Sequence, residues 1–486
     1  MRIALFAPIP PTRSGIASYT AALLPWLARR HHVDVFTDDR PGAPTPLPTG
    51  AAHRFNAHDF IWRRAREPYD LVVYQLGNST VHSYMWPYLV RYPGLVVIHD
   101  GSLHDERYMH YLSRGDSKGY QAEFAWNDPE HAAAARLCAE SPSAPLRFHW
   151  RMLRTPVSTA RTVAVHNQWL AAQLREEYPE ACIDVVRQGM DDPLSPETAV
   201  VRAKVRARYG FAATSVVFGA FGWITRPKRI PEIARAMASV AGHLPDARLL
   251  LVGSPVDDYD VRADLRAAGV EDRVILTGYV DDAEVPHHLA AIDVCLCLRW
   301  PTARETSATW LHAVAAGKAT LVTDLLHMQD LPVLTAARLR RRAPTMPLAT
   351  AAEPRDGGLG GAAPADAAPA ATRHGASSGE GSSAPIAVAV DIWNEEQELP
   401  AAMLALARDD ELRRRIGDAA RAWWAAGNTM QHSAKDYERV MAAAVTRPAA
   451  RCAIPPHLDH DGGRRARRLL APFGLLPDVL RRADTE

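Results

Sequence analysis

Residues 292–324 constrain the fold most, because an apolar strand there leads into a polar loop, a helix and a second strand. The first strand is expected over residues 292–298, a largely apolar run with neither proline nor glycine. The helix is expected to begin near Thr306, with Thr306 or Ser307 as its cap, and Gly317 is expected to end it. In a parallel sheet this order opens the first N–H groups of the helix toward a bound anion or sugar.

Glu305 is expected at the mouth of this helix. A carboxylate in that place can simply favour the positive end of the helix dipole, by about 0.3 to 1 kcal/mol. It can also contact a ligand that is held by the helix amides. The residues of this segment alone leave both interpretations open.

The composition is that of a globular protein with more than one domain. The chain has 486 residues, which exceeds what one ordinary core supports. Hydrophobic residues make up 47%, charged residues make up 23%, and the formal net charge of +1 argues against nucleic acid as a partner. The first residues are typical of a strand rather than a secretory signal, and no stretch reaches the roughly 18 apolar residues of a membrane span. A cytoplasmic location is therefore predicted.

The cysteines and paired aspartates give no sign of a metal site. The five cysteines are scattered, and Cys295 and Cys297 share one face of a strand, so they cannot easily bond to each other. Buried thiols in a reducing compartment are the prediction, and no zinc spacing is present in the sequence. Asp258 and Asp260 have the spacing of a metal-binding pair, but they precede a helix, so a helix cap is favoured.

Strands alternate with helices along both halves of the chain. In the first half, strands are expected at residues 2–6, 33–36, 71–75, 95–98, 162–165 and 183–187. In the second half, strands are expected at residues 216–221, 248–252, 274–276, 292–298 and 386–390. This alternation predicts an α/β protein with doubly wound parallel sheets.

Two further helix openings carry groups suited to phosphate. Gly15 opens a helix after the first strand, where the backbone can approach a phosphate, although a glycine that only allows the turn would look the same. Arg226, Lys228 and Arg229 lie where a strand ends and a helix begins. They would neutralise a diphosphate, or they would form a solvated basic turn.

Taken together, these motifs resemble the GT-B glycosyltransferases of the large retaining family called GT4 or group 1. The matching segments occur in the family's order and are PPTRSGIASY, VVIHD, VAVHNQWL, RPKRI, RVILTGYV and ETSATWLHAVAAGKATLVTD. The resemblance covers residues 1–338 and 386–446, and it implies two Rossmann-like domains that face a central cleft. The acceptor-side domain would span residues 1–194 and the nucleotide-sugar domain residues 195–430. A crossover helix at residues 431–446 would return to the first domain.

The resemblance also implies roles for residues at matching positions. The amide of Gly15 would lie beside the donor diphosphate, and His99 would face the transferred sugar. Catalysis would depend on Glu305, Lys228 and His99. The donor would be bound by Gly15, Arg226, Lys228, Glu305, Thr306, Ser307 and His312.

On the acceptor side, the candidates at or near strand ends are Asn78, His82, Asp100 and His104. Each could line the acceptor site, and His104 could assist the acceptor. Polar residues at such ends are common in any α/β protein, and a histidine with satisfied hydrogen bonds is the more frequent case. These assignments are hypotheses.

His312 departs from the family pattern, which has a second glutamate five residues before the glycine that ends the helix. Counting back from Gly317 also puts the place of the first glutamate at Arg304, one residue before Glu305. The second glutamate usually holds the nucleotide ribose. The ribose contacts and the identity of the donor are therefore open.

The function implied is transfer of a sugar from a nucleotide-sugar donor to a hydroxyl acceptor, with retention at the anomeric carbon. The acceptor would be a glycan, a lipid-linked intermediate or a small molecule, and neither a metal nor a cofactor is expected. Two alternatives of other classes stay open. One is an enzyme like the nucleotide-sugar 2-epimerases, which would carry paired carboxylates and a histidine in the cleft. The other is a non-catalytic scaffold with the same fold.

Two segments fall outside the resemblance. Residues 342–385 are rich in alanine, glycine, proline and serine, and a disordered insertion is predicted there. Residues 447–486 form a tail that is predicted to be flexible or docked on a domain. Its basic residues are followed by an apolar strip, so peripheral contact with the inner face of a membrane is the alternative.

Overall fold

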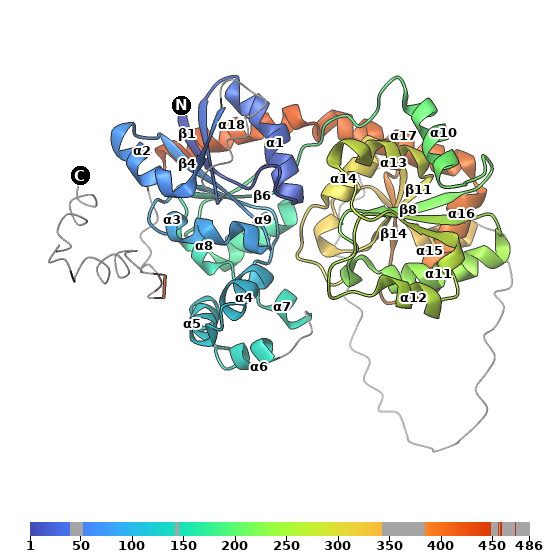
Figure 1. The fold of residues 1–486 in the computed structure, drawn as a ribbon, viewed down its shortest axis with the longest axis horizontal. Helices are drawn as coiled ribbons and strands as arrows, with labels where there is room; N and C mark the ends of the chain where they lie inside the picture. Colours follow the sequence, from blue (N-terminus) through green and yellow to red (C-terminus); the bar gives the residue numbers. More distant parts are fainter. Residues whose placement is uncertain are drawn as a thin grey trace, which may run out of the picture.

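The computed structural model describes residues 1–38, 52–140, 145–342 and 384–448, together with residues 455, 457, 458 and 472. The predicted insertion lies almost entirely outside the described residues, and so does most of the predicted tail. The described chain forms two α/β units that lie side by side (Figure 1).

The first unit is built on a seven-stranded sheet in the order β3-β2-β1-β4-β5-β6-β7, and all of its strand pairs are parallel. Its strands are β1 (Arg2–Phe6), β2 (His32–Thr37), β3 (Ala52–Asn56), β4 (Leu71–Leu76), β5 (Leu95–Ile98), β6 (Thr162–Val165) and β7 (Ile183–Val185). The central strands β1, β4 and β5 are almost wholly buried, which explains their continuous apolar sequences.

The second unit repeats this plan. Its seven-stranded parallel sheet has the order β10-β9-β8-β11-β12-β14-β13. The strands are β8 (Val217–Phe221), β9 (Arg248–Val252), β10 (Val274–Leu276), β11 (Val294–Cys297), β12 (Ala319–Thr323), β13 (Val333–Thr335) and β14 (Ala387–Val390). The predicted α/β class with two doubly wound sheets is thereby confirmed.

Helices cover both sheets. The first unit has α1 (Gly15–Ala28), α2 (Phe60–Arg66), α3 (Trp86–Leu89), α4 (His104–Leu112), α5 (Ser117–Asn127), α6 (Ala134–Glu140), α7 (Pro145–His149), α8 (Arg154–Thr159) and α9 (Gln168–Glu177). The second unit has α10 (Thr198–Arg208), α11 (Ile230–His243), α12 (Val261–Ala267), α13 (Val285–Ala291), α14 (Ala308–Ala315), α15 (Ala336–Arg342), α16 (Glu395–Arg408) and α17 (Asp410–Gly427).

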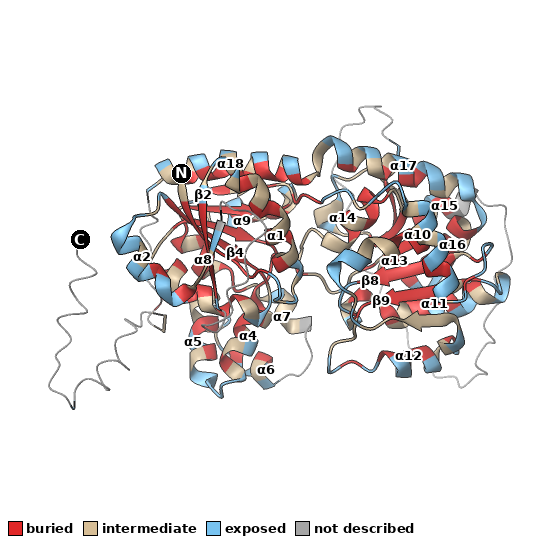
Figure 2. Cartoon of the chain, turned by 45° about the horizontal axis from the view of Figure 1, so that its top comes forward, coloured by how far each residue is buried: buried red, intermediate tan, exposed pale blue. Residues whose placement is uncertain are grey.

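Helix α18 (Met430–Thr446) extends from the second unit back over the first (Figure 1). Tyr437, Val440 and Met441 are fully buried against the first sheet, in one cluster with Leu5 and Val73. The opposite side of the helix is exposed, as the two colours of α18 in Figure 2 show. This amphipathic helix therefore completes the core of the first unit.

Helices α4–α7 form a lobe that projects from the first unit (Figure 1). Hydrophobic periodicity predicts no element between β5 and β6, so this lobe is an addition to the predicted fold. The reason is that its helices are short, and their apolar residues pack among themselves in a separate cluster with Tyr111, Tyr120 and Phe124. A short helix shows too few turns for a 3.6-residue pattern to be recognised.

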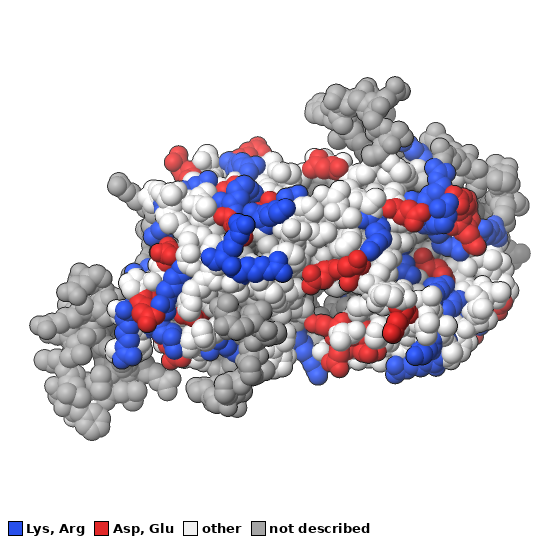
Figure 3. All heavy atoms as spheres, turned by 90° about the horizontal axis from the view of Figure 1, so that it is seen from above, with Lys and Arg blue, Asp and Glu red and all other residues white. Residues whose placement is uncertain are grey.

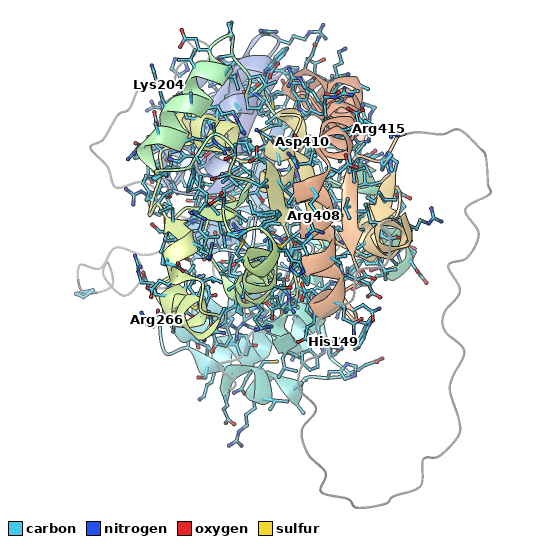
Figure 4. All side chains as sticks on the ribbon, turned by 90° about the vertical axis from the view of Figure 1, so that its right-hand side faces the viewer. His149, Lys204, Arg266, Arg408, Asp410 and Arg415 are labelled. Atoms are coloured by element: carbon cyan, nitrogen blue, oxygen red, sulfur yellow. The ribbon has the colours of Figure 1, made fainter. Side chains whose placement is uncertain are left out.

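The surface is charged but mixed. Lys and Arg side chains lie between Asp and Glu side chains over the face in Figure 3, in keeping with the near-zero net charge. The residues labelled in Figure 4 are all exposed and lie on the solvent side of their elements; they are His149, Lys204, Arg266, Arg408, Asp410 and Arg415. Among the described helices, none is long and apolar enough to cross a membrane.

Candidate active site

The loop after β11 and the start of α14 have the geometry that the sequence predicts. Ser307 is the N-cap, and its Oγ accepts a hydrogen bond from the N–H of Trp310 at 3.3 Å. Gly317 has a φ of +64°, the left-handed conformation that ends a helix. The N–H groups of the first turn of α14 are therefore directed toward the loop.

Glu305 is held in this loop by two partners. Its Oε1 lies 2.8 Å from Nε of Arg299, and its Oε2 accepts a hydrogen bond from Oγ1 of Thr302 at 3.0 Å. The Glu305 side chain is only 11% exposed. These contacts fix the carboxylate in one orientation. The sequence analysis did not assign Arg299 to the site, although it directly follows the strand.

Lys228 is buried below the same loop. Its Nζ donates a hydrogen bond to the carbonyl of Phe221, the last residue of β8, at 2.5 Å. Burial, together with the positive charge of Arg299, lowers the pKa of Lys228 to about 7. Lys228 and Arg299 thus place two basic groups together at the carboxyl end of the sheet.

Arg226 is oriented differently from Lys228. It lies in the 3-10 turn η3 (Arg226–Lys228), and its side chain is 66% exposed. Its guanidinium is 4.0 Å from Asp264 of α12 and lies 4.9 Å from the centre of the Tyr259 ring. Its role in holding a diphosphate stays a prediction, and Arg299 is the arginine that this structure brings to Lys228.

On the opposite wall, His99 follows β5 and belongs to a buried chain of hydrogen bonds. Its Nε2 is 2.6 Å from Oε1 of Gln75, and its Nδ1 is 3.0 Å from Nε2 of His166. Burial holds the pKa of His99 well below its usual value, and the nearby His166 adds to this effect. His99 is therefore a neutral group with a fixed ring orientation.

Asp100 comes next in the chain and faces the second unit. Its Oδ2 accepts a hydrogen bond from the N–H of Asn78 at 2.7 Å. Burial raises the pKa of Asp100 to about 7, and the negative charge of Glu305 contributes to the rise. The cleft thus brings two carboxyl groups from different units close enough to interact.

His82 is another residue that its place near a strand end predicts for the acceptor side. Its Nδ1 is 2.9 Å from the carbonyl of Gln75, while its buried Nε2 has no hydrogen-bond partner among the described residues. A Cβ built at Gly77 would lie 2.2 Å from Cδ1 of Ile16, 2.9 Å from this Nε2 and 3.2 Å from Oδ2 of Asp100. The absence of a side chain at Gly77 therefore lets Ile16, His82 and Asp100 approach this backbone closely.

Asn78 and His104 lie behind this wall. Oδ1 of Asn78 accepts a hydrogen bond from the N–H of Glu106 at 3.0 Å, so Asn78 supports the start of α4. Both ring nitrogens of His104 are engaged, Nδ1 with the carbonyl of Trp150 at 2.6 Å and Nε2 with the hydroxyl of Tyr120 at 2.7 Å. His104 is thus tied to the helical lobe, and its acceptor role stays a prediction.

Gly15 and His312 are the remaining residues of the predicted donor site. Gly15 is the first residue of α1, after the cap Ser14, and a Cβ built there would meet nothing within 4 Å. His312 lies one turn into α14, with its ring 6.1 Å from that of Phe221 and edge-on to it. Burial lowers the pKa of His312, so its imidazole is neutral near pH 7. Their contacts with a donor stay predictions.

The two walls touch across the cleft. The guanidinium of Arg13 lies 3.9 Å from the centre of the Tyr279 ring, and Ser18 donates a hydrogen bond to Asp282. Gly101 packs so closely on the loop after β11 that a Cβ there would lie 2.7 Å from the carbonyl oxygen of Ala303. The structure therefore shows a closed arrangement.

Two minor expectations are also settled in the described residues. Oδ1 of Asp260 accepts a hydrogen bond from the N–H of Ala263 at 3.0 Å, so the helix-cap interpretation is confirmed. Cys138, Cys182, Cys295 and Cys297 are free thiols, and Cys182 is exposed rather than buried. Cys182 lies in the short turn before β7, which explains why the prediction of buried thiols is wrong there.

The two facing sheets and the closed cleft define the GT-B fold. Sucrose-phosphate synthase from Thermosynechococcus elongatus has a similar structure, with a TM-score of 0.59 at 15% identity, over 91% of this chain and 100% of that chain. The Anabaena protein HepE, in a complex with UDP and glucose, gives 0.55 at 16% identity, over 91% of this chain and 100% of that chain. At these identities the likeness shows the fold.

Sequence comparison then finds a family match over part of the chain. Residues 215–333 match the model of the family described as Glycosyl transferases group 1. Over 139 residues the chain is 30% identical to 2-deoxystreptamine glucosyltransferase from Streptomyces kanamyceticus. The aligned segment makes up 28% of this chain and 34% of that enzyme. The chain thus matches about a third of the length of that relative. The resemblance to group 1 glycosyltransferases of GT-B fold is confirmed.

Proposed function

We propose that this protein is a glycosyltransferase that moves a sugar from a nucleoside-diphosphate donor to a hydroxyl group, with retention at the anomeric carbon. The observation that carries the proposal is the meeting of Glu305, Lys228 and Arg299 with Asp100 across one closed cleft. The fold and the family match support the same class. HepE binds UDP and glucose in its own structure, which makes UDP-glucose a first donor to test.

On the donor side, positive charge would stabilise the leaving diphosphate. Lys228, Arg299 and the first amides of α14 lie together at the carboxyl end of the second sheet. Charge that develops on the leaving phosphate would be met by groups that are already in place, which is the usual source of the largest rate effect. Glu305, fixed by Arg299 and Thr302, would bind hydroxyls of the sugar.

On the acceptor side, His82 and Asp100 would lie beside the attacking hydroxyl. His82 offers an unpaired ring nitrogen there, and Asp100 offers a carboxyl group with a pKa of about 7. In the proposed reaction the acceptor oxygen forms a bond to the anomeric carbon while the bond from that carbon to the phosphate oxygen breaks. The leaving phosphate takes the acceptor proton, so no protein nucleophile is needed.

One observation keeps the epimerase alternative in view. Asp100 and Glu305 are coupled carboxyl groups in a cleft that also holds His99, which is a set of groups expected of a 2-epimerase. The two reactions differ in their products. An epimerase would exchange the hydrogen at C2 of a UDP-sugar with solvent deuterium, whereas a transferase would release UDP without such exchange.

The test is a screen of UDP-, GDP-, ADP- and TDP-sugars by thermal shift and by release of nucleoside diphosphate, with and without a chelator. One donor should raise Tm and be slowly hydrolysed. With that donor, Glu305→Gln should lower kcat/KM roughly 100-fold, as expected for loss of a charged site contact. Glu411→Gln, on the exposed side of α17, is the matched control. Equal activity in Glu305→Gln and wild type would contradict the site.

A further inference from the structure

Two histidines and an aspartate meet at the far edge of the first sheet. Asp34 of β2 is paired in register with His53 of the edge strand β3. His32 lies two residues before Asp34, so both side chains point to the same face of the strand. The potential ligand atoms of His32, Asp34 and His53 all lie within 4.8 Å of one another. Within the part of the chain that the structure describes, this is the one group of its kind.

The distances fit a metal ion. Nε2 of His32 is 3.2 Å from Oδ1 of Asp34, and Nδ1 of His53 is 3.7 Å from the same oxygen. Ligand atoms at about 2.0 to 2.2 Å from a tetrahedral zinc ion are separated by roughly 3.3 to 3.6 Å. Small rotations of two half-exposed imidazoles would therefore place all three atoms around one ion. A water molecule would complete the coordination.

The carboxylate of Asp34 is already oriented for this task. It is 1% exposed, and its other oxygen, Oδ2, accepts a hydrogen bond from the hydroxyl of Tyr69 at 2.6 Å. Nη2 of Arg2 lies 3.4 Å from the same Oδ2. Oδ1 thus remains directed at the histidines. Hydrogen bonds to the second oxygen of a ligand are a common means of fixing its direction toward a metal.

The local charge does not oppose a cation. The guanidinium of Arg2 also pairs with Glu67, and the N–H of Arg2 donates to Oδ2 of Asp70 at 2.7 Å. Two carboxylates, those of Asp34 and Glu67, therefore pair with the guanidinium of Arg2, and a third, that of Asp70, lies at its backbone N–H. Their excess negative charge would favour a divalent ion over the empty state.

We propose that His32, Asp34 and His53 bind a divalent transition-metal ion, for which zinc is the best match. Two imidazoles and one carboxylate are a ligand set that zinc accepts. The site lies at the amino ends of β2 and β3, whereas the candidate active site lies at the carboxyl ends of the strands, so the ion has no part in sugar transfer. It would instead cross-link the edge strand β3 to β2. The sequence alone does not indicate this site, because its ligands come from two strands that are brought together only in the folded protein.

The experiment uses the full chain, stripped of metal with EDTA and desalted. After incubation with ZnCl₂ and a second desalting, elemental analysis should find one zinc per chain. Zinc at a hundredfold excess over its Kd should also raise Tm by about 2 °C or more. His32→Ala and His53→Ala should each lose both effects. Their side chains are 46% and 58% exposed, so both variants should fold.

The matched control is His131→Ala. His131 is an exposed histidine that pairs with Asp128 at 2.8 Å but has no third ligand. This variant should keep the zinc and the rise in Tm. Cobalt(II) gives a second readout, because its visible absorption band in wild type should be lost in His53→Ala and kept in His131→Ala. Failure of wild type to retain zinc, or equal retention by His32→Ala and His53→Ala, would overturn the proposal. None of these outcomes depends on the proposed transferase activity.

Discussion

At the scale of single residues, burial tunes the groups of the cleft before any ligand arrives. Lys228 is 8% exposed and its ammonium has a lowered pKa of about 7. Such a group is poorly charged when alone and becomes charged when an anion pairs with it. Without a ligand, the site therefore avoids the full free-energy cost of a buried charge. When an anion is bound, Lys228 becomes charged and pairs with it.

This tuning predicts proton uptake on donor binding. At pH 8 the amine of Lys228 is mostly neutral in the free protein, and a bound diphosphate would raise its pKa, so binding should take up close to one proton. Calorimetry of nucleoside-diphosphate binding in phosphate and in Tris buffers would measure this uptake. Lys228→Met should abolish it. Undiminished uptake in that variant would assign the proton to another group.

Asp100 predicts a pH dependence of stability. Its folded pKa of about 7 is raised above the ordinary value of 3.8, so its contribution to stability is complete below about pH 4 and is lost as the pH rises toward 7. Asp100→Asn should remove this loss and keep the hydrogen bond from Asn78. Denaturant unfolding of both proteins from pH 4 to pH 8 is the measurement. A constant difference in free energy of unfolding across this range would show that Asp100 titrates normally.

At the scale of elements, the start of α14 serves both stability and binding. Ser307→Ala should cost about 1 kcal/mol of folding free energy, as expected for loss of an N-cap. Asp260→Ala removes the corresponding cap of α12 and should cost a similar amount. Only the Ser307 variant should also weaken donor binding, because the amides of α14 face the donor loop. Equal donor affinity in the two variants would argue against that role.

The sequence predicts the elements of the sheets well, because their strands are buried on both faces and leave continuous apolar runs. The predicted bounds of β1, β5, β6, β9 and β10 agree with the structure residue for residue. Among the strands, β3 and β13 escape prediction; β3 has the sequence AHRFN, which contains no apolar run. Helix α10 also escapes prediction.

The candidate site is predictable only in part. Positions at strand ends indicate Glu305, Lys228 and Asp100 from the sequence alone. The partners that orient such groups cannot be predicted in this way, because contacts such as that between His99 and His166 join residues far apart in the chain. Neither spacing nor periodicity carries that information.

At the scale of the whole molecule, a few contacts at the mouth of the cleft hold the two units closed. Arg13 of the first unit stacks on Tyr279 of the second. A cation–π contact at such a site is worth about 0.5 to 1 kcal/mol. Loss of this contact would shift the population toward an open form, which binds a donor less tightly.

Arg13→Ala should therefore raise the donor KM roughly two- to fivefold, which is the factor that corresponds to loss of this cation–π energy at room temperature. Arg29→Ala is the matched control, because Arg29 stacks on Trp26 at 4.2 Å within the first unit and has no part in closure. Its KM should be that of wild type. Donor titrations followed by small-angle scattering would show whether Arg13→Ala also widens the unliganded molecule, and equal KM values for the two variants would contradict the role in closure.

The path of α18 has a consequence for how the protein is made. All strands of the first sheet have left the ribosome once Val185 has emerged, yet the helix that covers part of one face begins only at Met430. Throughout synthesis of the second unit, the nascent chain exposes the apolar surface that Tyr437, Val440 and Met441 later cover. A fragment that ends after β7 should accordingly aggregate, and supplying α18 as a separate peptide should rescue it. The unit that is translated first is the one that is finished last.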